Sequence, residues 1–309
     1  MYGIGIIGLG VMGRRFIAGL RASPDFRIVA GYDPAAVEAD VKRAASVEAL
    51  LADPALDCVY IATPPATHEN LVRQVAEAGK AVFCEKPLTA DPASARRCLE
   101  AVERAGVPAA VNFPFATAPA AVRLKELVET GTLGDDLSAH LTLRFRTWPR
   151  GWQQGAVGWL AGPEQGGFTR EVVSHFVFLA GRLFGLGKIA EAEVERGPNG
   201  SETRMRASLL FPTARMTIDA AVGGEAEEFN RFEVKGSKDV AVMSEWYRLT
   251  HSGGNIEPAR ADAHQIADFA KLLAGRKSRL ATVREAAEVV DIVEGILAGQ
   301  DPRAAPTAA

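Results

Sequence analysis

Two short stretches of the sequence carry residue types that can bind a nucleotide and move a proton. In GIIGLGVMGRRF, Gly8, Gly10 and Gly13 have the G-x-G-x-x-G spacing of a phosphate-binding turn. In AVFCEKPLTAD, Glu85 and Lys86 follow an apolar run and stand side by side before a proline. A lysine at the end of a buried strand can donate to a substrate oxygen that gains negative charge. The first stretch predicts a dinucleotide site, and the second predicts a proton donor beside it.

Each position of the glycine turn has a physical use. The first glycine permits the tight turn, the second lets a pyrophosphate approach the backbone, and the third lets a helix pack against the strand. Val11 and Met12 then lie at the N-terminus of that helix, where backbone N–H groups face the phosphate charge. The alternative is a turn whose glycines serve only the fold.

Asp33 strengthens the nucleotide prediction. It ends the next expected strand, 20 residues after Gly13, where a carboxylate can accept hydrogen bonds from the adenosine ribose hydroxyls. The same carboxylate repels a 2'-phosphate, and Pro34 follows where a basic residue would pair with one. The motif therefore favours NAD as the cofactor over NADP.

Further polar residues are expected at the same crevice, because ligands of doubly wound sheets lie across the carboxyl ends of the strands. They come from ATPPATH, from EKP and from the strand that ends near residue 113, and they comprise Thr63, Pro64, His68, Glu85, Lys86 and Asn112. For Glu85 we expect a contact with the cofactor or with the other domain. His68 either braces its loop or is an early helix residue exposed to water.

The elements that position these residues alternate between short apolar strands and helices. Strands are expected at 2–8, 26–33, 57–65, 81–87 and 107–113, and helices at 11–22, 46–53, 67–79 and 91–106. Ser46 and Asp91 are the expected N-caps, and Gly79 is an expected helix stop. Continuous apolar strands separated by helices predict an α/β domain with a parallel sheet covered on both faces, the doubly wound Rossmann arrangement.

The pattern changes after about residue 118. A helix at 120–131 precedes strands expected at 136–148, 188–197, 203–212, 214–223, 230–237 and 238–251, and helices follow near 260–275 and 283–298. Alternating polar and apolar residues predict a large, mainly antiparallel open sheet. We expect a dinucleotide-binding domain over 1–118 and an α+β domain over 119–309 that binds substrate and mediates oligomerisation. The last helices are expected to pack back on the first domain, before a disordered tail.

The composition argues against several classes of function. Lysine plus arginine total 35 against 38 acidic residues, so the net charge of -3 lacks the basic excess of a nucleic-acid-binding protein. Cys58, Cys84 and Cys98 form no close-spaced metal pattern and indicate the reduced core thiols of a cytoplasmic protein. No apolar run approaches the ~18 residues that span a bilayer. We therefore expect no metal, no nucleic acid and no membrane partner.

The glycine turn, TPPATH, EKP and a glycine-led helix ending in histidine together resemble the Gfo/Idh/MocA oxidoreductases. The resemblance covers nearly the whole chain and implies NAD(P)-linked oxidation or reduction of a secondary alcohol on a sugar, cyclitol or related polyol. It matches the family's EKP lysine to Lys86 and its D-x-x-x-H pair to Glu171 and His175. The sequence departs from the family pattern here: glutamate replaces the usual aspartate, Val173 stands where glycine is common, and Phe178 where a second aspartate often lies.

The implied chemistry gives three residues a role. Hydride transfer from a C–H bond requires a base for the adjacent hydroxyl, and His175 is the expected base because an imidazole exchanges protons near neutral pH. Glu171, four residues earlier on an expected helix, shares its face and binds a substrate hydroxyl or orients the imidazole. Lys86 stabilises the charge that develops on the substrate oxygen and helps relay the proton.

Residues 147–187 form a long excursion between two strands, and such excursions often carry function. Trp152 and two further tryptophans form an apolar wall for a sugar ring or, alternatively, are core and interface anchors. Arg170, or one of two arginines on the preceding strand, binds an acidic group of the substrate or belongs to a solvated face. We expect Trp152, Arg170 and Asn112 to contact the substrate together with Lys86, Glu171 and His175.

Two alternatives to a dehydrogenase or reductase are compatible with the sequence. One is a redox-neutral epimerase or glycosidase that oxidises its substrate transiently, and the other is a non-catalytic nucleotide-sensing protein. The exposed face of the antiparallel sheet is a ready association surface, so we expect a homodimer or homotetramer.

Overall fold

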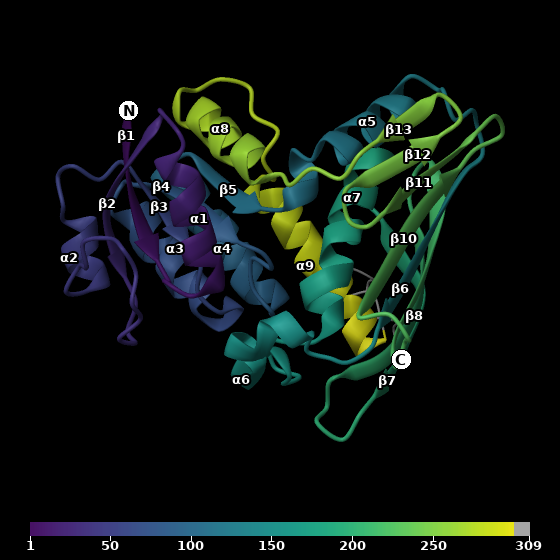
Figure 1. Ribbon diagram of the computed structural model, residues 1–309, viewed down its shortest axis with the longest axis horizontal. Helices are drawn as coiled ribbons and strands as arrows, with labels where there is room; N and C mark the ends of the chain where they lie inside the picture. Colours follow the sequence, from purple (N-terminus) through teal and green to yellow (C-terminus); the bar gives the residue numbers. More distant parts are fainter. Residues whose placement is uncertain (300–309) are drawn as a thin grey trace. The chain divides into compact units, whose positions relative to one another are not determined.

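A computed structural model describes residues 1–299 of the chain, which form two compact units (Figure 1). The first unit combines Met1–Thr117 with Ala261–Ala287, and the second combines Ala118–Arg260 with the residues from Glu288 onward. The expected tail from residue 300 lies outside the described residues. The chain thus passes from one unit to the other three times, after residues 117, 260 and 287.

The first unit is built on a five-stranded parallel sheet. Its strands are β1 (Tyr2–Ile7), β2 (Phe26–Tyr32), β3 (Cys58–Ile61), β4 (Ala81–Glu85) and β5 (Ala109–Asn112), in the order β2-β1-β3-β4-β5. β3 and β4 are buried at every position, as expected for strands covered on both faces. The strand order reverses between β1 and β3, and in such sheets the ligand crevice lies at that reversal.

Helices connect and cover these strands. They are α1 (Val11–Arg21), α2 (Val47–Leu51), η1 (Pro65–Thr67), α3 (His68–Glu77), α4 (Pro92–Ala105), η2 (Pro114–Ala116) and α8 (Asp262–Leu273). The expected N-caps are confirmed: Ser46 Oγ accepts from Ala49 N at 3.1 Å, and Asp91 Oδ2 accepts from Ser94 N at 2.7 Å. The doubly wound α/β prediction is therefore confirmed.

Helix α8 belongs to the first unit although it follows the whole second sheet in the sequence. Phe269 on α8 stacks on Phe83 and Phe26, with ring centroids 4.9 and 5.8 Å away. Asp262 at its start forms a bidentate ion pair with Arg15 on α1. An aromatic core contact and a charge-assisted clamp thus attach this late helix to the dinucleotide-binding sheet.

The second unit contains an eight-stranded sheet. Its order is β13-β12-β11-β10-β6-β9-β8-β7, with β6 (Leu137–Phe145), β7 (Lys188–Arg196), β8 (Glu202–Leu210), β9 (Ala214–Val222), β10 (Glu228–Lys235), β11 (Val240–Ser244), β12 (Arg248–His251) and β13 (Gly254–Ile256). All pairs are antiparallel except β6 with β9. The prediction of a large, mainly antiparallel sheet is confirmed.

The single strand predicted over 238–251 is wrong. Glu245 and Trp246 adopt positive φ angles of 48° and 65°, and β11 and β12 pair with each other across this turn. No glycine marks the turn in the sequence, and non-glycine residues are rare in this conformation. The turn is stabilised by the Trp246 N–H, which donates to Asn230 Oδ1 at 2.8 Å.

The remaining elements of the second unit are α5 (Pro119–Glu129), η3 (Gly151–Ala156), α6 (Val157–Leu160), η4 (Thr169–Val173) and α7 (Ser174–Phe184), together with the end of α9 (Val283–Ala298). Helices α5 and α7 lie along one side of the sheet (Figure 1). Phe176 of α7 packs against Phe232 of β10 on that side, with ring centroids 5.8 Å apart. The other side of β6, β8, β9 and β10 carries mostly polar and charged side chains.

Within residues 1–299, no helix is both long and apolar enough to cross a membrane. The same residues contain no group of three or more His, Cys, Asp or Glu side chains arranged to hold a metal ion. Cys58, Cys84 and Cys98 are all buried free thiols.

Candidate active site

The glycine turn of the first unit has the shape that a dinucleotide requires. Gly8 has a positive φ of 95°, and a Cβ there would lie 2.5 Å from the Ala62 carbonyl oxygen. A Cβ on Gly13 would lie 2.0 Å from the Gly8 carbonyl oxygen. At Gly10, by contrast, a Cβ would meet nothing within 4 Å, so space is open above the N-terminus of α1. Two glycines pack the turn, and the third leaves room for a phosphate to approach the helix N–H groups.

Asp33 is held firmly at the end of β2. Its Oδ2 accepts from Leu9 N at 2.8 Å, and its Oδ1 accepts from Ala35 N at 2.9 Å. Each carboxylate oxygen can accept a further hydrogen bond, so ribose hydroxyls can still bind. The turn and this carboxylate together fit a dinucleotide.

Arg43 organises the backbone beyond Asp33 and was missed from the sequence. Its Nη2 donates to the carbonyl oxygens of Asp33 at 2.7 Å and Ala35 at 3.0 Å, and its Nη1 donates to that of Val37 at 2.8 Å. Nothing in the local spacing marks this arginine, because it folds back from ten residues further on. A basic side chain therefore lies beside the loop that follows Asp33, where the sequence motif predicted only the negative charge of the aspartate.

Lys86 follows β4 at the carboxyl edge of the sheet, the edge at which the glycine turn and Asp33 also lie. Its side chain is half-buried, and the Lys86–Pro87 peptide bond is cis. Thr63 and Pro64 follow β3 at this edge and are half-buried, while Val11 at the start of α1 is exposed. The first unit thus brings the predicted nucleotide residues and the predicted proton donor to one edge.

Glu85, which was predicted to contact the cofactor or the other domain, lies inside the sheet of the first unit. It is 6% exposed and accepts hydrogen bonds from the Tyr60 hydroxyl, from Asn112 Nδ2 at 2.6 Å and from the Lys86 backbone N–H at 3.2 Å. Burial raises the pKa of Glu85, and these donors and the Lys86 charge lower it by less. The buried Tyr60–Glu85–Asn112 network ties β3, β4 and β5 together directly behind Lys86. Because Asn112 is also buried, its predicted substrate contact is replaced by this structural one.

His68 is fully buried and braces two loops, which is the first of its two sequence interpretations. Its Nε2 lies 2.8 Å from the Thr63 carbonyl oxygen, and its Nδ1 lies 3.0 and 3.1 Å from those of Pro87 and Leu88. Burial lowers the pKa of this imidazole. The prediction that His68 contacts the cofactor is wrong, because the side chain has no exposed surface; it joins the TPPATH and EKP loops.

In the second unit, Glu171 lies in η4, a π-helical turn, and not in a regular α-helix. The Ser174 N–H reaches the Thr169 carbonyl oxygen five residues back, and α7 begins at Ser174. This wider turn differs from the α-helix from which the shared face of Glu171 and His175 was argued. Turns of this kind often occur at functional sites.

Glu171 and His175 each lie against residues that the sequence did not connect to them. Glu171 Oε1 accepts from Gln153 Nε2 at 3.2 Å and forms an ion pair with Arg150 Nη2 at 3.5 Å. His175 is buried, and its ring packs edge-on against Trp246, with centroids 5.4 Å apart. The Arg150 guanidinium carbon lies 5.9 Å from the centre of the same tryptophan ring. The two predicted catalytic residues therefore share one neighbourhood in the second unit.

Comparisons with known proteins agree with this geometry. Residues 2–113 match the model of the Gfo/Idh/MocA oxidoreductase family, which is described by an NAD-binding Rossmann fold. Inositol 2-dehydrogenase from Rhizobium meliloti is 29% identical over 80% of this chain and 69% of its own length. An NADP-dependent D-xylose 1-dehydrogenase from Haloferax volcanii is 32% identical over 69% of this chain and 59% of its own length.

Residues 2–113 of the chain thus belong to the Gfo/Idh/MocA family. The fold of the chain also matches the WlbA dehydrogenase from Bordetella pertussis, solved with NADH and UDP-GlcNAcA, with a TM-score of 0.84 at 20% identity over 96% of this chain and 95% of that one. At this identity the structural match concerns the fold alone. The prediction of an oxidoreductase of this family, made from the glycine turn, TPPATH, EKP and the glycine-led helix that ends in histidine, is confirmed.

Within this family member, Arg170 does not have the role expected for it. Its Nε and Nη2 bind both carboxylate oxygens of Glu294 at 2.6 and 2.7 Å, and its Nη1 donates to the carbonyl oxygens of Pro163 and Gly166. The prediction that Arg170 binds substrate is wrong, because its donors anchor the loop before η4 to helix α9.

The tryptophans were predicted to form either an apolar wall for a sugar ring or core anchors, and Trp148 and Trp152 differ in this respect. Trp148 packs against Phe145 and Phe168, at 5.3 and 6.1 Å between ring centroids, and so serves the core. Trp152 is 59% exposed, and the Arg150 guanidinium lies 4.8 Å from its ring centre. Trp152 is therefore the tryptophan whose exposed ring can still meet a ligand.

Proposed function

We propose that the protein is an NAD-dependent dehydrogenase or reductase that moves a hydride between nicotinamide and a secondary alcohol or ketone of a neutral sugar, cyclitol or related polyol. One observation carries this proposal: Lys86 directly follows β4 at the sheet edge that also holds the open glycine turn and Asp33. A cation-bearing proton donor at the edge of a dinucleotide cradle fits alcohol–ketone chemistry.

The cofactor would be held by the N–H groups at the start of α1, by the backbone at Gly10 and by Asp33. NAD, when bound, supplies the hydride acceptor. We favour NAD over NADP because the fixed Asp33 carboxylate meets the position of the ribose hydroxyls. The family contains members named for either cofactor, including the NADP-dependent xylose dehydrogenase, so the preference of this chain depends on its own residues.

Three side chains carry the proposed substrate chemistry. Lys86 donates a hydrogen bond to the substrate oxygen and stabilises its charge. His175 accepts the hydroxyl proton during oxidation and returns it during reduction. Glu171 binds a neighbouring hydroxyl of the substrate, and the Trp152 ring offers an apolar face for the sugar carbons.

A neutral substrate is favoured by the charges around Glu171. Arg150, which contacts Glu171, and Arg170, which directly precedes Glu171 in the sequence, are bound to the protein's own carboxylates Glu228 and Glu294. Neither guanidinium is therefore placed to receive an acidic group of a substrate. Inositol and D-xylose, after which two of the relatives are named, are neutral polyhydroxy compounds.

Substitution of the two proposed proton-handling residues tests this function. Lys86→Ala and His175→Ala should each lower turnover by about 10²- to 10⁴-fold, because general acid–base catalysis contributes about that much. The affinity for NAD, measured by quenching of protein fluorescence, should be unchanged in both variants. Lys277→Ala and His264→Ala serve as matched controls, since both residues are exposed and belong to the first unit, outside the second sheet.

The substrate is sought first, by screening neutral sugars, cyclitols and sugar acids for a change in nicotinamide absorbance. Wild-type rates in both Lys86→Ala and His175→Ala would overturn the proposed mechanism. A product that forms without net accumulation of NADH would instead identify the redox-neutral epimerase or glycosidase. Turnover of sugar acids alone would contradict the neutral substrate class.

We also propose that the protein is a cytoplasmic homo-oligomer that associates through the exposed face of the second sheet. The three buried free thiols suit a reducing compartment. On the exposed face, Phe229 of β10 is 44% exposed among polar neighbours, and a second copy of the chain would cover it.

A further inference from the structure

We infer that Arg150 is a positioning residue that acts on the substrate through Glu171. The inference rests on the proposed function, in which Glu171 binds a substrate hydroxyl. Arg150 lies directly before η3, and its side chain is only 4% exposed. A guanidinium this deeply buried cannot reach a substrate in solution, so any effect on the substrate passes through its protein partners.

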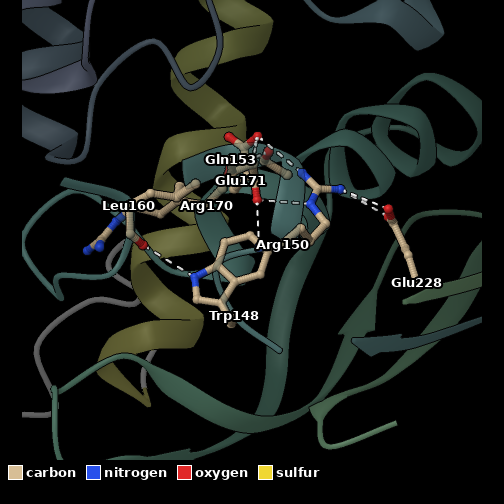
Figure 2. Close-up of polar contacts among 8 residues, drawn as sticks. Trp148, Arg150, Gln153, Leu160, Arg170, Glu171 and Glu228 are labelled. Atoms are coloured by element: carbon tan, nitrogen blue, oxygen red, sulfur yellow. Dashed lines mark hydrogen bonds and ion pairs between the residues drawn. The ribbon is translucent and has the colours of Figure 1, made fainter. Parts of the chain in front are cut away.

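The guanidinium holds three partners at once (Figure 2). Nη1 donates to both carboxylate oxygens of Glu228, at 3.0 and 3.1 Å, and Nε donates to Gln153 Oε1 at 3.0 Å. Nη2 meets Glu171 Oε1 at 3.5 Å, and Gln153 Nε2 donates to the same oxygen at 3.2 Å. One oxygen of Glu171 is therefore held from two directions by groups that are themselves bonded to each other.

The order of these contacts shows where the rigidity originates. Glu228 is the first residue of β10, and both of its carboxylate oxygens accept from the same nitrogen, Arg150 Nη1, in charge-assisted contacts that are shorter than the 3.5 Å contact with Glu171. The sheet thus fixes Arg150 through Glu228, and Arg150 with Gln153 then fixes Glu171. A glutamate side chain has several free torsions, and its ordering costs entropy unless neighbouring groups hold it.

Aromatic rings fix the guanidinium further. Its central carbon lies 4.8, 5.6 and 5.9 Å from the ring centres of Trp152, Trp148 and Trp246. These rings attract the cation and exclude water, so the charge interactions inside the cluster are stronger than at a surface. Trp246 also packs on His175, which places the fixed cluster beside the proposed base.

A double-mutant cycle separates positioning from a general role in folding. Arg150→Met and Glu171→Gln should each lower kcat/KM for the polyol by about 10- to 100-fold, the range for losing a charge-assisted hydrogen bond. The Arg150→Met/Glu171→Gln double variant should be no worse than Glu171→Gln alone, because Arg150 acts only through that carboxylate. Gln153→Met, which leaves the Arg150–Glu228 pair intact, should show the same non-additivity with a smaller single effect.

Arg144→Met is the matched control. Arg144 pairs with Asp219 at 2.6 Å in the same unit and has no contact with Glu171 among the described interactions. Its effect on kcat/KM should multiply with that of Glu171→Gln. Thermal unfolding and NAD affinity are measured for every variant. If Arg150→Met does not fold, the cycle between Gln153→Met and Glu171→Gln tests the positioning role instead.

The inference would be refuted if the losses in kcat/KM caused by Arg150→Met and by Gln153→Met each multiply with the loss caused by Glu171→Gln. Arg150 would then be a structural residue. Failure of the proposed function would give a different result, because the wild-type protein itself would then turn over no polyol. That result would also overturn the inference.

Discussion

Asp33 performs two tasks, since it fixes the glycine turn through Leu9 N and presents carboxylate oxygens to a ribose. Asp33→Ser should weaken NAD binding by about 10- to 100-fold, because charged hydrogen bonds contribute about 1.5–3 kcal/mol each. The affinity for NADP should fall less, since the repulsion of a 2'-phosphate is removed as well. Arg43, which already lies beside this loop, supplies a positive charge that favours the same direction of change.

Titration calorimetry with both cofactors measures this preference. Asp40→Ser is a suitable control because its carboxylate is exposed and pairs with Arg21 at the surface. An unchanged ratio of NAD to NADP affinity in Asp33→Ser would contradict the ribose assignment.

The residues that sequence reasoning placed correctly are those whose chemistry depends on local spacing. The glycine turn and the helix caps follow from positions a few residues apart. Glu85 and Arg170 were misplaced because their partners, Tyr60 and Glu294, lie 25 and 124 residues away in the chain. Charged side chains are seldom buried, so nothing local predicts which of them will be satisfied inside the protein.

At the scale of elements, the loop that leads into η4 rests on a buried carboxyl group. Glu202, the first residue of β8, is 2% exposed, and a Cβ on Gly167 would lie 2.1 Å from its Oε2. Burial raises the pKa of Glu202, and the Thr169 hydroxyl and the Arg170 and Arg196 charges lower it by less. The folded protein thus retains this proton at pH values where the unfolded chain has lost it.

Glu202→Gln should therefore become more stable relative to the wild-type protein as the pH rises. Below the unfolded-state pKa of 4.5 both states bind the proton and the difference is constant. Above it the wild-type protein loses up to about 1.4 kcal/mol per pH unit, until the pH exceeds the folded-state pKa. Denaturant unfolding at several pH values measures this, with Glu195→Gln on exposed β7 as control. A stability difference that does not change with pH would disprove the assignment.

Periodicity predicted the strands well but not the turns that lack a local marker. The two sheets follow from apolar runs and from alternation, which reflect the burial of strand faces. The π-helical turn at η4 and the break at Glu245 have no such marker, because both depend on contacts made after folding.

At the scale of the whole molecule, the proposed association depends on the exposed sheet face. Phe229→Lys places a charge opposite Arg144, its neighbour across the β10–β6 pair, and should shift sedimenting species to lower mass. Burial of a phenylalanine contributes about 1.5–3 kcal/mol, so the dissociation constant should rise at least about 10-fold. Leu186→Lys is the control, because Leu186 is also exposed but lies outside the strands. A wild-type monomer, or equal masses for both variants, would rule out this interface.

The three passages of the chain between the units make the second sheet an insertion within the first unit. A gene fragment that stops at residue 118 would omit α8 and leave Phe26 and Phe83 without the ring of Phe269. Neither unit can therefore be separated from the other by dividing the chain at a single position. A chimera that gives this dinucleotide domain to another catalytic domain needs three junctions, near residues 117, 260 and 287, and must carry α8 along.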